Sequence, residues 1–207
     1  MSREIDSETI RNHYSQQLEK HGATPEGVSW NSESAQIIRF TQLSRVIRTD
    51  EEFSLIDYGC GYGALLDYLR AEGCRFRYTG YDISQEMIDK ANKLHQGASA
   101  CHFTTREDEL EAADYCVESG IFNIRFGYSD ESWLEYILAT LGKMDRLGQR
   151  GFAFNLLTRY TDANILRPEL YYADPAFFFD YCKSSFSKNV ALLHDYDLYD
   201  FTVIVRK

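Results

Sequence analysis

The sequence predicts a three-layer α/β fold, in which helices cover both faces of one doubly wound, mostly parallel sheet of seven strands. Short apolar runs alternate with helical runs from residue 53 onward, which is typical of parallel strands joined by helices. The last two apolar runs, 189–194 and 199–206, are too close for a parallel crossover, so the last strand should run antiparallel. The 207 residues, of which 44% are hydrophobic, suffice for one such domain.

The elements follow in order. Helical spacing marks residues 7–21 and 33–48, and we expect residues 1–50 to form an N-terminal helical cap on a main domain of residues 51–207. In that domain we expect strands at 53–59, 76–82, 100–105, 112–119 and 150–157 and helices at 64–72, 84–95 and 130–147. The aromatic segment 157–182 is unusual for a simple crossover, so we expect it to be part core and part lid.

Composition restricts the function. The net charge is −10 and the chain has no dense basic run, which disfavours nucleic acid as a partner. No apolar run is long enough to span a membrane, and the N-terminus lacks a signal-peptide core. The five cysteines form no Cys-x-x-Cys and the histidines share no spacing, so we expect reduced thiols, no metal site and a cytoplasmic location.

One stretch, "LIDYGCGYGALLDYL" at 55–69, places an acid beside a loop with glycines at 59, 61 and 63. The loop fits the dinucleotide pattern G-x-G-x-x-A, but Asp57 is a poor neighbour for a pyrophosphate. Asp82 ends the next strand, where a carboxylate can accept from two ribose hydroxyls or can cap the following helix beside Ser84. A ligand with a ribose, a cationic amino end and no phosphate fits both acids, and S-adenosylmethionine is such a ligand.

These residues carry a resemblance to a known family. "LIDYGCGYG" and "YTGYDIS" resemble the first two motifs of the class I S-adenosylmethionine-dependent methyltransferases, and "ADYCVESGIF" is similar to their fourth strand and its loop. The resemblance implies their Rossmann-like fold, with S-adenosyl-L-methionine as cofactor. The resemblance also suggests which residues bind the cofactor, and two further residues, Trp30 and Arg39, are added because the N-terminal loop should lie near the carboxyl edge of the sheet. The residues that the resemblance suggests are Asp57, Gly59, Cys60, Gly61, Tyr62, Asp82, Ile83, Thr105, Glu118 and Ser119.

Acceptor chemistry should come from the carboxyl ends of the fourth to sixth strands. His194 is the candidate catalytic base for a hydroxyl acceptor, although a structural histidine is the alternative, and an amine acceptor needs no base. Arg159 and Arg167 among aromatic rings suggest an anionic group on the acceptor. The candidate substrate residues are Tyr14, Phe122, Asn123, Asn155, Arg159, Tyr160 and Tyr196.

The sequence therefore predicts a methyltransferase for a small-molecule or sugar-type acceptor, and it leaves the oligomeric state open. A nicotinamide-dependent oxidoreductase is one alternative, disfavoured by Asp57 and by the lack of a second domain for a substrate. A non-catalytic S-adenosylmethionine sensor or protein-binding module is the other. It would keep both acids but would have no defined acceptor pocket.

Overall fold

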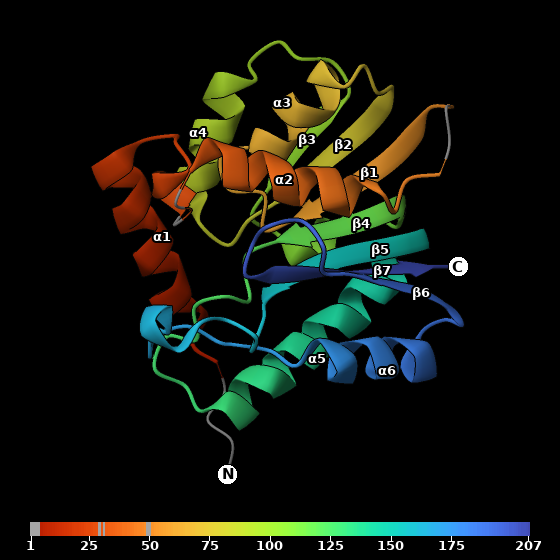
Figure 1. Cartoon of the computed structure of the whole chain (residues 1–207). Coiled ribbons are helices and arrows are strands. Elements are labelled where there is room, and N and C mark those ends of the chain that lie inside the picture. Colours follow the sequence, from red (N-terminus) through yellow and green to blue (C-terminus); the bar gives the residue numbers. More distant parts are fainter. Residues whose placement is uncertain (1–4, 29, 31, 49–50) are drawn as a thin grey trace.

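The computed structural model describes residues 5–28, 30, 32–48 and 51–207. Its centre is one seven-stranded sheet of order β3-β2-β1-β4-β5-β7-β6 (Figure 1). The strands are β1 (Phe53–Tyr58), β2 (Phe76–Tyr81), β3 (Cys101–Thr104), β4 (Ala113–Ser119), β5 (Gly148–Leu157), β6 (Asn189–Leu193) and β7 (Asp200–Arg206). β7 runs antiparallel to both β5 and β6, and the other neighbouring strands are parallel. The predicted fold class and the reversed last strand are confirmed.

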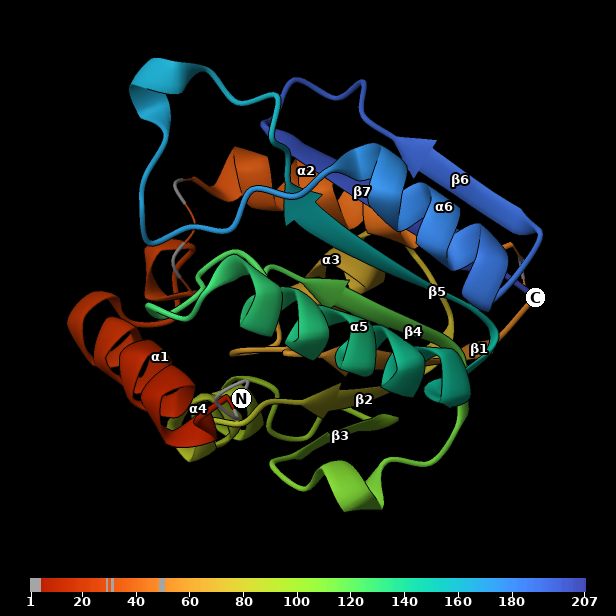
Figure 2. The ribbon, with the colours of Figure 1, turned by 90° about the horizontal axis from the view of Figure 1, so that it is seen from below.

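Helices cover both faces of the sheet (Figures 1 and 2). On one face lie α2 (Glu33–Ser44), α3 (Ala64–Ala71) and α4 (Gln85–Leu94), and on the other lie α5 (Asp130–Leu147) and α6 (Pro175–Ser185). The first helix, α1 (Ser7–His21), lies at the edge formed by the carboxyl ends of the parallel strands, next to α4. Short 3-10 turns occupy Glu26–Val28, Glu107–Glu109 and Ala163–Ile165.

Alternation along the strands divides the core into two layers. In β5, Phe152 and Phe154 join the cluster under α5 and α6, whereas Ala153 between them joins the cluster under α2, α3 and α4. In β1, Leu55 and Tyr58 likewise belong to opposite clusters. Burial on both faces explains why these strands are nearly continuous apolar runs in the sequence.

α2 is part of the helical layer over the sheet. The helix ends at Ser44, before the end expected at residue 48. Leu43 and, just beyond the helix, Val46 are fully buried in the same cluster as Leu55 of β1. A single boundary at residue 50 remains a prediction, but the packing joins α2 to the main domain.

α6 lies in the segment for which the sequence analysis assigned no element. Asp174 caps its N-terminus, Pro175 occupies the first turn, and Phe178 and Cys182 are buried one turn apart against the sheet. Exposed Phe177 beside buried Phe178 hides the helical period in the sequence. Among the described helices, none has the length and apolarity needed to cross a membrane.

Candidate active site

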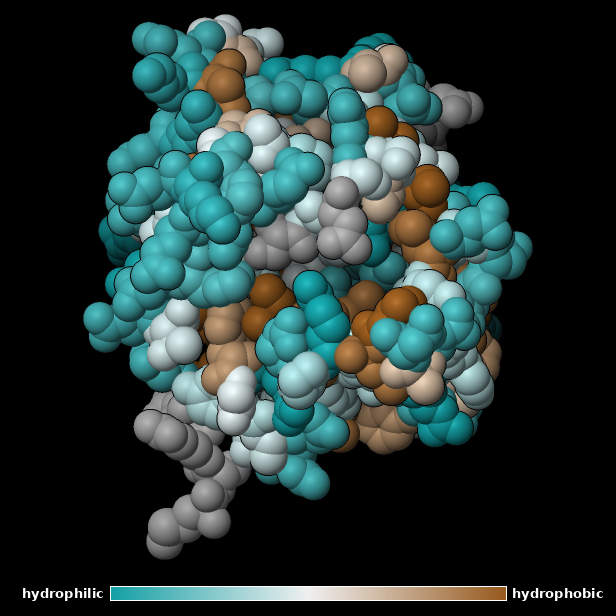
Figure 3. All heavy atoms as spheres, turned by 60° about the vertical axis from the view of Figure 1, so that its left-hand side comes forward, coloured by the Kyte–Doolittle hydropathy of each residue, from teal (hydrophilic) through white to brown (hydrophobic). Residues whose placement is uncertain are grey.

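A chamber opens at the carboxyl ends of β1, β2 and β4. It encloses about 900 Å³ free of protein atoms, open solvent at its mouth included. Its walls come from the loop after β1, the ends of β2 and β4, and residues of α1, α2 and α5. Figure 3 shows the side of the molecule on which α1 lies, where hydrophobic atoms gather in the middle and lower right of a face that is hydrophilic at its upper left. The chamber therefore lies at the carboxyl ends of the parallel strands, which is the edge at which α/β sheets bind ligands.

The glycine loop forms the floor of this chamber with bare backbone. The amides of Gly59 and Cys60 both donate to the carbonyl of Tyr81, at 2.7 and 2.9 Å, which ties the loop to β2. Gly59 has a φ of +90°, and a Cβ built on it would lie 2.2 Å from Cγ2 of Ile121. Glycine tolerates the positive φ and has no Cβ to collide with Ile121, so it is the residue that fits this position. Without a side chain, the backbone can approach a ligand closely here.

Asp82 joins the loop to the second strand. One carboxylate oxygen accepts from the amide of Gly61 and the other from the amide of Ser84, each at 2.9 Å. The cap of α4 is Ser84, whose hydroxyl accepts from the amide of Met87 at 3.2 Å, so capping is not the role of Asp82. Each carboxylate oxygen can accept a second hydrogen bond. Because Asp82 lines the chamber, a ligand there can supply the donors.

Asp57 is the second acid of the chamber. It is buried and accepts a hydrogen bond of 2.6 Å from the hydroxyl of Tyr78. Burial raises the pKa of Asp57 to about 7, with the Tyr78 hydrogen bond opposing and the charge of Asp82 adding to the shift. Among the described residues that line the chamber there is no Lys, Arg or His. This charge distribution suits a cationic ligand and opposes a pyrophosphate.

Side chains that the sequence analysis did not assign to the site complete the chamber. Tyr136 of α5 and Ile10 of α1 line it, as do Gln36 and Phe40 of α2. Burial raises the pKa of Tyr136 to about 12, so it is protonated at neutral pH. The only available signal for Tyr136 was its place at the edge of the apolar stripe of the predicted helix 130–147.

The N-terminal segment closes one side of the chamber. Trp30 packs on the end of β4, where a Cβ added to Gly120 would lie 2.2 Å from Cζ2 of Trp30. The Cζ atom of Arg39 lies 4.0 Å from the centroid of the Trp30 ring. Arg39 and Gly120 therefore both lie against this ring.

A second, smaller chamber adjoins the first. It encloses about 510 Å³ free of protein atoms, open solvent included, and it shares Tyr14, Val28, Trp30 and Gly120 with the first chamber. Its polar wall residues are Arg39, Asn123 and Arg167. Its remaining walls are apolar, from Ile124, Leu157 and Leu170.

Most of the predicted cofactor residues lie together. The first chamber is lined by Asp57, Gly59, Cys60, Gly61, Tyr62, Asp82, Ile83, Ser119 and Trp30. Arg39 lines the second chamber, whereas Thr105 and Glu118 line neither. Glu118 is fully buried, its Oε1 accepts from the amide of Ile121 at 2.7 Å, and burial raises its pKa.

The predicted acceptor residues are more scattered. Tyr14 lines both chambers and Asn123 the second, while the remaining residues of that set line neither. Those others are Phe122, Asn155 and Tyr196, which are buried, and Arg159 and Tyr160, which lie after β5.

His194 also lies outside both chambers. It is exposed, with its ring centroid 6.0 Å from that of Tyr160. The physical reason is the sheet order: β7 lies between β5 and β6, so the end of β6 is at the outer edge of the sheet.

Comparisons with known proteins agree with this geometry. A model of the methyltransferase domain family matches residues 13–181. "Putative methyltransferase Rv1506c" of Mycobacterium tuberculosis (strain ATCC 25618 / H37Rv) is 49% identical over 163 residues, which are 79% of this chain and 98% of that protein.

Two solved structures share the fold. Magnesium protoporphyrin IX methyltransferase from Synechocystis PCC 6803, with bound S-adenosylhomocysteine, has a TM-score of 0.65 at 16% identity and covers 98% of this chain and 100% of its own. The N-methyltransferase NodS from Bradyrhizobium japonicum WM9 has a TM-score of 0.66 at 16% identity, covering 96% and 98%. With its matching motifs, sheet order and family model, the chain belongs to the class I S-adenosylmethionine-dependent methyltransferases.

Proposed function

We propose that this methyltransferase transfers the methyl group of S-adenosyl-L-methionine to a small-molecule or sugar-type acceptor. The observation that carries the proposal is the pair of adjoining chambers. The first has two buried acids and no cationic wall residue among those described, and the second shares four wall residues with it. A cationic cofactor and a small acceptor would meet where the two chambers adjoin.

The first chamber fits the cofactor in charge and shape. The free acceptor positions of Asp82 suit the ribose hydroxyls, and Asp57 suits the positive amino end beside the backbone of Gly59 and Gly61. The apolar walls at Ile83 and Tyr136 suit the adenine ring. For Glu118 we propose a supporting role, since it holds the amide that follows Gly120, and Thr105 remains a candidate adenine contact.

When bound, the cofactor would supply an electrophilic methyl group: the bond from this carbon to sulfur would break as its bond to the acceptor forms, and S-adenosylhomocysteine would be the leaving group. The protein then has to position the acceptor and exclude water. Tyr14 and Trp30 form the walls where the chambers adjoin, and burial raises the pKa of Tyr14 well above its ordinary value, so it is no base at neutral pH. His194 lies outside both chambers. The arrangement favours an uncharged amine over a hydroxyl that would use His194.

A labelled-methyl experiment tests this function. Purified protein is incubated with a cell extract and methyl-labelled S-adenosylmethionine, and the label is followed into small molecules, protein and nucleic acid. We expect label in a small molecule with the native protein and little with Asp82→Asn. Label in protein or nucleic acid would contradict the proposed acceptor class, and cofactor binding without any transfer would favour a sensor. We propose the cytoplasm as the location, because the five cysteines are free thiols.

A further inference from the structure

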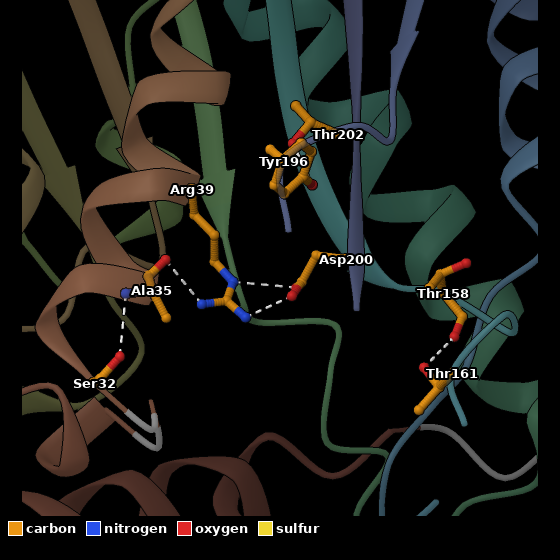
Figure 4. Close-up of polar contacts among 8 residues, drawn as sticks. All are labelled: Ser32, Ala35, Arg39, Thr158, Thr161, Tyr196, Asp200 and Thr202. Carbon is orange, nitrogen blue, oxygen red and sulfur yellow. Dashed lines mark hydrogen bonds and ion pairs between the residues drawn. The ribbon is translucent and has the colours of Figure 1, made fainter. Parts of the chain in front are cut away.

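Arg39 lines the second chamber and has unused hydrogen-bond donors. Arg39 is nearly buried, and its Nε and Nη2 donate to the two carboxylate oxygens of Asp200, at 3.2 and 2.5 Å (Figure 4). Its Nη1 donates to the carbonyl of Ala35 at 3.0 Å. A guanidinium carries five N–H groups, so one hydrogen on Nη1 and one on Nη2 have no partner among the described residues.

Two N–H groups on neighbouring nitrogens are the fork that binds a carboxylate or a phosphate with two parallel hydrogen bonds. The guanidinium is held rigidly, because Asp200 binds one side of it and the Trp30 ring lies against its face. A fixed fork loses little side-chain entropy when an anion binds. A buried donor pair beside an open chamber thus indicates an anionic ligand.

Asn123 and Arg167 extend the same site. Asn123 is nearly buried, its Oδ1 has no partner among the described residues, and it lines the second chamber. Arg167 lines the chamber too, with its Nε 3.3 Å from Glu169. An unpartnered buried amide costs free energy unless a ligand group satisfies it. The chamber therefore matches an anion on Arg39 with a hydroxyl or amino group beside Asn123.

We propose that the second chamber binds the anionic oxygen group, a carboxylate or a phosphate, of the methyl acceptor on the two unpaired Nη hydrogens of Arg39. The inference rests on the proposed function, since it assigns the acceptor to this chamber. It also moves Arg39 from the cofactor, where the sequence analysis placed it, to the acceptor. Val28, Leu157 and Leu170 then enclose the apolar part of the acceptor.

The test uses inorganic phosphate and acetate as probes. Each is titrated into the full-length protein saturated with S-adenosylhomocysteine, and binding is followed by NMR line broadening of the probe. The variants are Arg39→Lys, which keeps the charge but loses the fork, and Asn123→Ala, which leaves the Arg39–Asp200 pair intact. Arg159→Gln is the control, because Arg159 is a partly exposed arginine outside both chambers that pairs with Asp174.

We expect the native protein, the control and Asn123→Ala to bind a probe alike, because Asn123 is assigned to a neutral group of the acceptor. Arg39→Lys should bind the probe at least ~10-fold more weakly, as the loss of a charge-assisted hydrogen bond requires. Tighter phosphate binding assigns a phosphate monoester and tighter acetate binding a carboxylate, and either supports the site. Equal binding by Arg39→Lys and the control would overturn the proposal.

A second measurement distinguishes the acceptor from the cofactor. Affinity for S-adenosylhomocysteine is compared with affinity for 5′-methylthioadenosine, which lacks the amino-acid carboxylate. We expect Arg39→Lys to leave both affinities within about twofold of the native values, a change in binding free energy smaller than RT. Loss of affinity for S-adenosylhomocysteine alone would assign the fork to the cofactor carboxylate and overturn the proposal. Failure of the native protein to bind S-adenosylhomocysteine would instead contradict the proposed function.

Discussion

Asp57 and Asp82 determine the charge of the first chamber, which we propose for the cofactor. Both are buried with few neutralising neighbours, and burial raises the pKa of each. Buried carboxylates without a cationic partner are costly to the folded protein, so their retention in one chamber is best explained by a ligand that carries the missing charge and donors.

Asp82 is the residue whose replacement should act most directly on the cofactor. Asp82→Asn places an NH2 group opposite the amide of Gly61 or Ser84 and removes acceptor positions from the chamber. We expect the affinity for S-adenosylhomocysteine to fall by ~10- to 100-fold in calorimetry. Asp89→Asn, an exposed change on α4, is the control and should bind as the native protein does. Equal affinities of the two variants would contradict the role of Asp82.

Asp57 should make cofactor affinity depend on pH. With a pKa of about 7, its carboxyl is protonated in acid and must lose that proton to attract a positive ligand. We expect affinity for S-adenosylmethionine to rise between about pH 6 and 8, by at most ~10-fold per pH unit for one released proton. Asp57→Asn should flatten this rise in pH-resolved calorimetry, and an unchanged slope in the variant would contradict the assignment.

The raised pKa of Asp57 also affects the stability of the folded protein. Its contribution to stability falls as the pH rises, whereas cofactor affinity increases. The folded protein holds a proton on Asp57 up to about pH 7, whereas the unfolded chain releases it near the ordinary value of 3.8. The contribution of Asp57 to the free energy of unfolding is thus present in acid and lost as the pH rises through 7. Asp57→Asn should remove this part of the pH dependence.

Gly120 and Gly127 form a matched pair of positions. Both have positive φ, +92° and +76°, but an added Cβ meets the Trp30 ring at Gly120 and nothing within 4 Å at Gly127. Alanine at either position should cost ~1–2 kcal/mol of stability through the backbone alone. Only Gly120→Ala should also displace Trp30 and weaken S-adenosylhomocysteine binding. Equal binding by the two variants, measured by calorimetry alongside thermal unfolding, would contradict the role of Trp30 as a wall.

Residues near one another in the sequence were the predictable part of the site. The glycine loop, Asp57 and Asp82 belong to a strand–loop–helix unit and the adjoining strand, so their positions follow from local structure. The contacts of Trp30 with Gly120 and of Arg39 with Asp200 join segments about 90 and 160 residues apart. They depend on how α2 packs against the sheet, which no local pattern determines.

Among the elements, α2 is the one whose attachment to the sheet can be tested most clearly, because this helix carries both a buried and an exposed apolar residue. Leu43 is fully buried in the core, while Ile37 is 44% exposed. Leu43→Ala should lower the free energy of unfolding by ~2–5 kcal/mol, and Ile37→Ala by no more than ~0.5 kcal/mol. Denaturant unfolding measures both. A similar small cost for the two would mean that α2 is a loosely attached cap.

The elements also show where sequence patterns fail. Strands buried on both faces and helices with one apolar stripe were predictable, whereas α6 was not, because Phe177 outside and Phe178 inside break its period. The place of His194 could not be predicted either. Its strand is sixth in the chain, but β7 inserts between it and β5, and this order depends on long-range pairing.

On the scale of the whole molecule, the sheet order brings the ends of β1, β2 and β4 together beneath α1 and the start of α2. One chamber is therefore formed by residues from 10 to 136, and the second adds residues up to 170. One compact fold thus assembles the chamber that we propose for the cofactor and the adjoining chamber that we propose for the acceptor.

The central claim is that the acidic chamber binds S-adenosylmethionine and its product. Calorimetric titration of the native protein with S-adenosylhomocysteine, and separately with NAD, tests it most directly. We expect one S-adenosylhomocysteine per chain, no heat of binding with NAD, and a stabilisation of ~2.7 kcal/mol when the ligand is present at a hundred times its Kd. Binding of NAD in the absence of any binding of S-adenosylhomocysteine would contradict the account.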